Sequence, residues 1–308
     1  MLSKIVFCIN DRISVDKQMQ AQAKAAIAYL NECGIAGELH HVTDGSRLIC
    51  DDPGQTLFLA DDEIVAQTLQ EKGYYVIAWQ AESDLNRKFG GVKYIFTNID
   101  EVDLDSYVKV YQRLAGISWT ILETERCLVR ETRVEDVDDF YRIYADPAMT
   151  RYMEGLFENP EDERRYTRDY IEKVYGFMGF GVWTVIEKCT GEIIGRAGFS
   201  VRNGFDEVEL GFLIGVPWQG KGYAMEVCRK IMEYGRTVLQ FGTVQTLVKK
   251  ENEISIHICE KLGFRAYDEV NIEENIYGES YQNGHSVSFS PSHYGKYIRL
   301  IWEADKRG

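Results

Sequence analysis

The chain lacks a long apolar run, a C-x-x-C pair and an excess of basic residues. Its longest early apolar run, from Ile5 to Ile9, is too short for a signal peptide or a membrane-spanning helix. The seven cysteines are an odd number without C-x-x-C spacing, which argues against a disulfide framework and against a zinc site. We therefore expect a cytoplasmic protein that enters no membrane and holds no metal.

The net charge is −14, and neither half of the chain offers a basic surface. Residues 1–119 carry 11 basic and 17 acidic side chains, and residues 120–308 carry 24 and 32. Because binding to a phosphate backbone needs clustered Lys and Arg, nucleic acid is not an expected partner. An acidic surface can attract cationic amines, although its plainer role is to keep the protein in solution.

The most informative segment is a glycine-rich turn between a strand pattern and a helix pattern. An apolar stretch over 209–216 is closed by Pro217, and apolar residues recur at helical spacing over 225–238. Between them stands Gln219-Gly220-Lys221-Gly222-Tyr223-Ala224. The small residues leave backbone N–H groups uncovered where the positive end of the helix dipole lies, so we expect a pyrophosphate site. A turn that needs glycine only for packing is the alternative.

This turn resembles a signature of the GNAT-type N-acetyltransferase superfamily, Q/R-x-x-G-x-G/A, with Gln219, Gly222 and Ala224 at its defining positions. About forty residues later, Asn252 and Ser255 followed by EKLGF at 260–264 are similar to the family's N-x-x-S/A…EKLGF segment. The two matches occur in the family's order.

Two upstream segments resemble the ribosomal-protein N-terminal acetyltransferase branch of that superfamily. They are LETERCLVR at 122–130 and Ala145-Asp146-Pro147. The resemblance implies an α+β acetyltransferase-type domain with a mixed sheet over 118–308. It also implies acetyl-CoA as co-substrate, without a metal.

The resemblance assigns the cofactor to the turn and to the strand before it. The strand is implied to splay from its neighbour, which leaves backbone N–H groups for the pantetheine arm and the thioester carbonyl. The implied cofactor-binding residues are Leu213, Ile214, Val216, Gln219, Gly220, Lys221, Gly222, Tyr223, Ala224 and Asn252. Lys221 is either a phosphate contact or a solvated turn residue.

Two carboxylates and two helix residues are the catalytic candidates. Glu209 and Glu207 lie on one face of the strand by period-two alternation, and Glu209 resembles the acidic residue that precedes this strand in the family. It is the expected base, acting directly or through water. Many acetyltransferases carry a tyrosine, the acid for the leaving thiolate, where this chain has Cys259. A buried cysteine is the structural alternative, and Ser255 is the other candidate donor.

The first domain, 1–117, alternates strand and helix patterns and predicts an α/β fold with a small parallel sheet, Rossmann-like or haloacid-dehalogenase-like. The stretch LFLADDEIVAQTLQEKGYYVIAW resembles the haloacid-dehalogenase fold over about 1–116, but the nucleophile pattern D-x-D-x-T/V is absent. Asn10-Asp11-Arg12 follows the first strand instead. We expect a domain without chemistry of its own, used for docking, dimerisation or ligand sensing.

The leading hypothesis is an acetyl-CoA-dependent N-acetyltransferase. The acceptor is a primary amine, either a small molecule or a protein N-terminus, which attacks the thioester directly in a ternary complex. The alternative is an acetyl-CoA-binding sensor or interaction protein with little catalysis. A homodimer is compatible with both.

Overall fold

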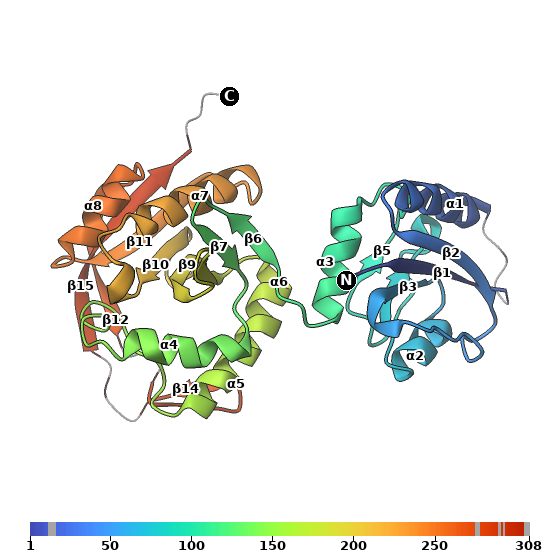
Figure 1. Ribbon diagram of the computed structural model, residues 1–308, viewed down its shortest axis with the longest axis horizontal. Helices are drawn as coiled ribbons and strands as arrows, with labels where there is room; N and C mark the ends of the chain where they lie inside the picture. Colours follow the sequence, from blue (N-terminus) through green and yellow to red (C-terminus); the bar gives the residue numbers. More distant parts are fainter. Residues whose placement is uncertain (12–16, 275–277, 289–290, 292, 305–308) are drawn as a thin grey trace. The chain divides into compact units, whose positions relative to one another are not determined.

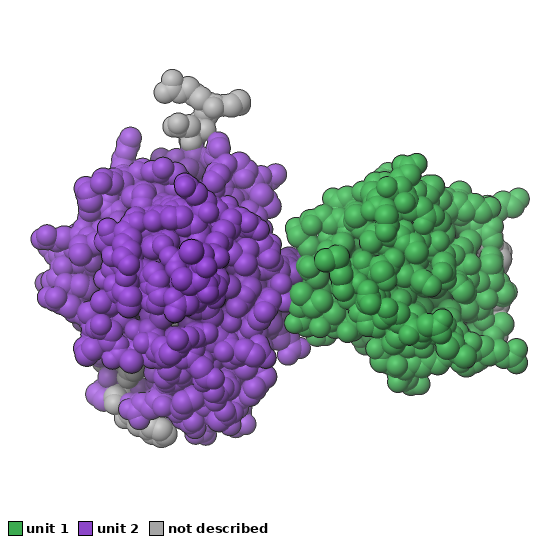
Figure 2. Space-filling model, viewed as in Figure 1, with its two compact units in different colours: residues 1–117 green, residues 118–308 purple. Residues whose placement is uncertain are grey.

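The computed structural model describes residues 1–11, 17–274, 278–288, 291 and 293–304. Contacts between Cα atoms divide the chain into two compact units, Met1–Ile117 and Ser118–Gly308 (Figure 2). No helix among the described residues is long and apolar enough to cross a membrane.

Unit 1 is built on a five-stranded parallel sheet with the strand order β2-β1-β3-β4-β5. Its elements are β1 (Lys4–Asn10), α1 (Lys17–Glu32), β2 (Ala36–Val42), β3 (Thr56–Ala60), α2 (Glu63–Glu71), β4 (Tyr75–Trp79), β5 (Ile95–Phe96) and α3 (Leu104–Leu114). Short 3₁₀ turns occupy Pro53–Gln55 and Glu82–Asp84.

Both faces of this sheet are covered, which explains why its central strands β1, β3 and β4 are buried and apolar at nearly every position. Along β1, Ile5 and Phe7 pack with α1 and α3, whereas Val6 and Cys8 pack with α2 on the opposite face. The predicted small parallel sheet is confirmed. The edge strand β5 is only two residues long.

A polar cluster lies where β1 and β3 end. The carboxylate of Asp61 accepts a hydrogen bond from the backbone N–H of Asn10 at 2.8 Å. Asp62 caps α2 and forms an ion pair with Arg87. Burial raises the pKa of Asp61 to about 6, because a carboxylate that is 5% exposed loses most of its hydration.

Unit 2 is built on an eight-stranded mixed sheet with the order β12-β15-β11-β10-β9-β8-β7-β6. Its strands are β6 (Thr120–Glu123), β7 (Cys127–Arg130), β8 (Val182–Glu187), β9 (Ile193–Val201), β10 (Val208–Ile214), β11 (Thr243–Lys249), β12 (Arg265–Glu274) and β15 (His293–Glu303). A separate hairpin is formed by β13 (Ser280–Gln282) and β14 (His285–Val287). The predicted mixed sheet is confirmed.

The helices of unit 2 cover both faces of its sheet (Figure 1). They are α4 (Val137–Tyr144), α5 (Pro160–Tyr170), α6 (Gly176–Met178), α7 (Tyr223–Thr237) and α8 (Glu253–Lys261), with a π-helical turn at Ile171–Tyr175 and 3₁₀ turns at Val134–Asp136 and Val216–Trp218. Leu210 and Val244 face α7 and α8, whereas Arg196 faces Phe140 of α4 on the other side. The site lies within this layered unit.

Candidate functional site

Strands β10 and β11 separate soon after they begin. They pair in parallel only at Val208 with Val244 and at Glu209 with Gln245. Beyond these pairs β10 continues to Ile214 and β11 to Lys249 without further pairing. The sheet therefore has an internal opening that widens toward the carboxyl ends of the two strands.

The edge of β10 that faces this opening carries hydrogen-bonding groups. Gly215 donates its N–H to Ile194, toward β9. Because N–H directions alternate along a strand, those of Ile214 and Phe212 point to the opposite edge, where pairing has ended. The amide of Leu213 points to β9. Phe212 was not among the sequence candidates, because a strand pattern does not tell which edge an amide faces.

The glycine-rich turn follows directly and holds two left-handed glycines. Gly220 has φ +71° and Gly222, the N-cap of α7, has φ +83°. A Cβ atom at Gly220 would meet nothing within 4 Å, and one at Gly222 would meet only Arg126 Nη2, at 3.6 Å. The turn needs glycine for its backbone conformation, since the space around it is open.

The backbone N–H groups of this turn are available to a ligand. Among the described residues, no carbonyl or side-chain oxygen accepts a hydrogen bond from the amides of 220–224. The side chain of Gln219 closes the loop instead, donating to the Ile214 carbonyl at 2.8 Å. A run of unpaired amides at a helix N-terminus is a site for an anion.

The side chains of the turn differ in their surroundings. Tyr223 is 7% exposed and its hydroxyl donates to Glu187, so its side chain belongs to the fold and only its amide faces outward. Lys221 is exposed, and among the described residues it forms no ion pair. Val216 lies in the 3₁₀ turn beyond β10, where its carbonyl accepts from the Gln219 N–H.

The start of α8 lies at the same edge of the sheet, because α7 and α8 both begin after the carboxyl ends of parallel strands. Asn252 is the N-cap of α8 and accepts from the Ser255 N–H at 3.2 Å. The Ser255 hydroxyl is half-buried, and no hydrogen bond joins it to another described residue. Two helix N-termini therefore direct positive potential toward the opening.

Cys259 lies on the buried face of α8 and is 0% exposed. Burial raises the pKa of its thiol to about 12, although a contact with Thr246 lowers it slightly. The side chain is packed among apolar residues of the core. In such surroundings a cysteine acts as a small hydrophobic residue.

Glu209 occupies the last paired position before the opening. Its side chain is 10% exposed and forms an ion pair with Arg202, with Oε2 2.6 Å from Nε. Gln245 lies beside it on β11 and is fully buried, and no hydrogen bond joins its Oε1 to any residue that the structure describes. Glu207 precedes β10 and lies 3.9 Å from Arg299. The two carboxylates are thus separately held by arginines.

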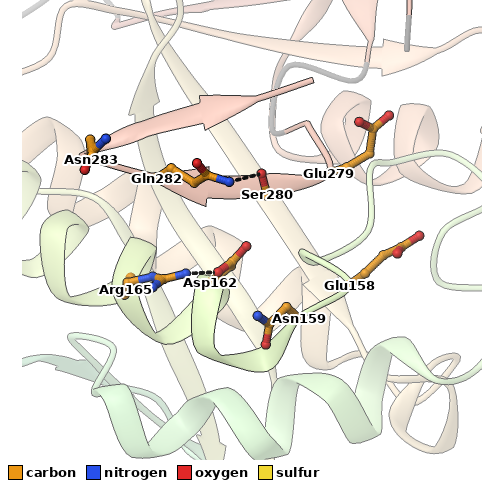
Figure 3. A pocket seen from close by; sticks show the side chains of 8 residues that line it. All are labelled: Glu158, Asn159, Asp162, Arg165, Glu279, Ser280, Gln282 and Asn283. Carbon is orange, nitrogen blue, oxygen red and sulfur yellow. Dashed lines mark hydrogen bonds and ion pairs between the residues drawn. The ribbon is translucent and has the colours of Figure 1, made fainter. Parts of the chain in front are cut away.

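A second concavity lies between the start of α5 and the β13–β14 hairpin (Figure 3). It is an open polar groove of about 740 Å³. Its walls are formed by Glu158, Asn159, Asp162 and Arg165 on one side, and by Glu279, Ser280, Gln282 and Asn283 on the other.

Tyr281 fixes the hairpin on α5. Its ring packs against those of Phe157 and Tyr166, which also contact each other, and its hydroxyl donates to Asp169 at 2.7 Å. Its backbone N–H donates to the buried carboxylate of Asp162 at 3.1 Å. The groove is therefore shaped by contacts between residues more than a hundred positions apart.

Sequence reasoning missed two arginines of the site. Arg126 precedes β7 and bonds to the glycine-rich turn and to Glu226, and Arg202 holds Glu209. The only signal for Arg126 was its place in the motif over 122–130, which says nothing of its partner. Among the described residues, no group of three His, Cys, Asp or Glu side chains is placed to hold a metal ion.

Comparison with known proteins places this geometry in a family. The model of the acetyltransferase (GNAT) domain matches residues 126–265. The uncharacterized N-acetyltransferase p20 of Bacillus licheniformis is 32% identical over 150 residues, which are 47% of this chain and 82% of that protein. Spermidine N(1)-acetyltransferase of Escherichia coli K12 is 35% identical over 156 residues, 50% of this chain and 81% of that protein.

Among solved structures, the ribosomal-protein-S5-alanine acetyltransferase of Vibrio fischeri is 16% identical, with a TM-score of 0.47, and the match covers 62% of this chain and 99% of that one. The family model and the two relatives above carry the assignment. The chain belongs to the GNAT family of N-acetyltransferases, whose co-substrate is acetyl-CoA.

Proposed function

We propose that this chain transfers the acetyl group of acetyl-CoA to a primary amine by direct attack in a ternary complex. The observation that carries the proposal is the run of unpaired amides over 220–224, at the start of α7 and beside the opening between β10 and β11. A phosphate-bearing ligand with an extended arm fits that combination, because the turn receives the anion and the free strand edge receives the arm.

The residues that would hold acetyl-CoA follow from these positions. The amides of Gly220, Gly222 and Ala224 would bind the pyrophosphate, and those of Phe212 and Ile214 would bind the pantetheine arm. Acetyl-CoA supplies the activated acyl group. The protein supplies orientation, which by itself can account for a large part of the rate.

Glu209 is the proposed acceptor of the proton that the ammonium must lose. It lies at the closed end of the opening and is largely screened from bulk water. Because both of its oxygens lie within hydrogen-bonding reach of Arg202, we propose that the proton reaches it through a water molecule. Glu207, just before the strand, is the second candidate for the residue that accepts this proton.

Ser255 is the proposed donor to the departing thiolate, and Cys259 is assigned to packing. Cys259 is 0% exposed and packed in the core, so its thiol is closed off from the opening in which the thiolate departs. The Ser255 hydroxyl is at the N-terminus of α8 and is half-buried rather than enclosed.

The acceptor is proposed to be a cationic small amine or a protein N-terminus. The Escherichia coli relative is named for spermidine, which makes polyamines the first small molecules to test. The groove of Figure 3 supports a cationic acceptor, since Glu158, Asp162 and Glu279 outnumber Arg165 in its walls.

The proposal is tested by titrating acetyl-CoA and CoA calorimetrically into the full chain and into Gly222→Val. A β-branched residue at φ +83° distorts the turn, so the variant should lose binding of both ligands. Gly34→Val is the matched control, because Gly34 has the same φ of +83° with nothing within 4 Å of its Cβ position, but lies in unit 1. Binding that survives in Gly222→Val would move the phosphate site elsewhere.

A further inference from the structure

Arg126 contacts the glycine-rich turn from a distant part of the chain. It lies just before β7, and its guanidinium carbon is 4.1 Å from the centre of the Tyr223 ring. Its Nη1 donates to the carbonyl of Lys221 at 3.0 Å. The side chain therefore covers one side of the turn over 221–223.

A carboxylate holds Arg126 in this place. The backbone N–H of Arg126 donates to Glu226 Oε1 at 2.9 Å, and its Nε donates to Oε2 at 2.7 Å. Nη2 lies 2.6 Å from the same Oε2. Burial alone would raise the pKa of Glu226, but hydrogen bonds from Thr124 and Arg126 hold it below its ordinary value. The pair is thus ionised and doubly bonded.

The bond to Lys221 determines which way the next amide points. No peptide bond among the described residues is cis. In a planar trans peptide the C=O and N–H directions are opposite, so a Lys221 carbonyl directed at Arg126 turns the Gly222 N–H away from the guanidinium. That amide is one of the unpaired donors of the turn. Since glycine accepts either sign of φ, the peptide between 221 and 222 has no local reason to keep this orientation.

Resting on the function proposed above, we propose that Arg126 is a positioning residue for cofactor binding. Clamped by Glu226, it bonds to the Lys221 carbonyl and thereby holds the Gly222 amide toward the phosphate. Arg126 acts by orienting the peptide between 221 and 222, whereas the amides themselves bind the phosphate. It does not act on the acyl group. Its loss should weaken recognition of the pyrophosphate and leave the chemistry at the thioester intact.

The test compares two acetyl donors in Arg126→Gln. With acetyl-CoA, KM should rise ~10- to 100-fold, the worth of one charge-assisted hydrogen bond and the orientation it maintains, while kcat stays within about twofold. With S-acetylpantetheine, which lacks the pyrophosphate, kcat/KM should change by no more than about twofold. Arg229→Gln is the control, because Arg229 is an exposed arginine on α7 and its loss changes the net charge equally.

Glu226→Gln gives a second, milder variant should Arg126→Gln fail to fold. It removes the clamp and keeps the arginine, so the same donor-dependent change is expected at smaller size. Equal losses with both donors, or an unchanged KM for acetyl-CoA, would overturn the positioning role. A wild-type chain that fails to bind CoA at all would instead overturn the proposed function and, with it, this inference.

Discussion

Asp61→Asn should stabilise unit 1 at neutral pH. The carboxyl of Asp61 has a pKa of about 6 in the folded chain against an ordinary value of 3.8, because burial disfavours its charged form. A folded pKa above the unfolded one contributes stability only at low pH, and that contribution is lost as the pH rises through 6. Two pKa units correspond to about 3 kcal/mol, which is the upper limit of the gain expected for the asparagine at pH 7.5.

The gain should depend on pH in a defined way. At pH 5 the buried carboxyl is mostly protonated, so the advantage of asparagine should be smaller by about 1.5 kcal/mol than at pH 7.5. An asparagine oxygen can still accept the N–H of Asn10, so the hydrogen bond at the end of β1 is kept. The substitution therefore removes only the free-energy cost of burying a charged carboxylate.

Hydrogen exchange of β1 and β3 amides in the full chain measures this local free energy. The neighbouring Asp62→Asn is the control and should have the opposite sign, since it loses the ion pair with Arg87 while asparagine still caps α2. A destabilised Asp61→Asn, or a gain of equal size at pH 5 and pH 7.5, would refute the reasoning.

Three further substitutions test the roles proposed for Glu209, Cys259 and Asn252. Glu209→Gln should lower kcat by ~100-fold or more, and a kcat within about twofold of the wild-type value would clear Glu209 of that role. Cys259→Ala should leave kcat within about twofold while unfolding measurements show a loss of ~1 kcal/mol, and a large loss of kcat in a folded variant would return the thiol to the mechanism. Asn252→Ala should cost ~1 kcal/mol of stability through the lost cap of α8 and weaken CoA binding modestly, and unchanged melting would contradict the capping role.

The turn and its flanks could be predicted from the sequence because local chemistry determines them. Pro217 cannot continue a strand, and the glycines of the turn adopt a φ that other residues avoid. The predicted strand over 209–216 and helix over 225–238 accordingly differ from β10 and α7 by one or two residues at each end. The parallel sheet of unit 1 followed from alternating apolar strands and helices.

Long-range pairings could not be predicted in the same way. Arg126 and Glu226 are 100 positions apart, and nothing local in either segment specifies the other. The early separation of β10 from β11 depends on how two strands are placed by the whole sheet, so it came only from family resemblance. The β13–β14 hairpin interrupts a tail rich in Tyr, Asn, Ser and Gly, whose composition does not reveal that Tyr281 docks on α5.

The most direct test of the central claim is the release of CoA from acetyl-CoA on addition of a primary amine, followed with a thiol reagent and with mass spectrometry of the amine. For the wild-type chain we predict amine-dependent CoA release with stoichiometric N-acetylation, retained in Gly34→Val and lost in Gly222→Val. Tight acetyl-CoA binding without acetylation of polyamines, other small amines or peptide N-termini would contradict the proposed acetyl transfer to these acceptors.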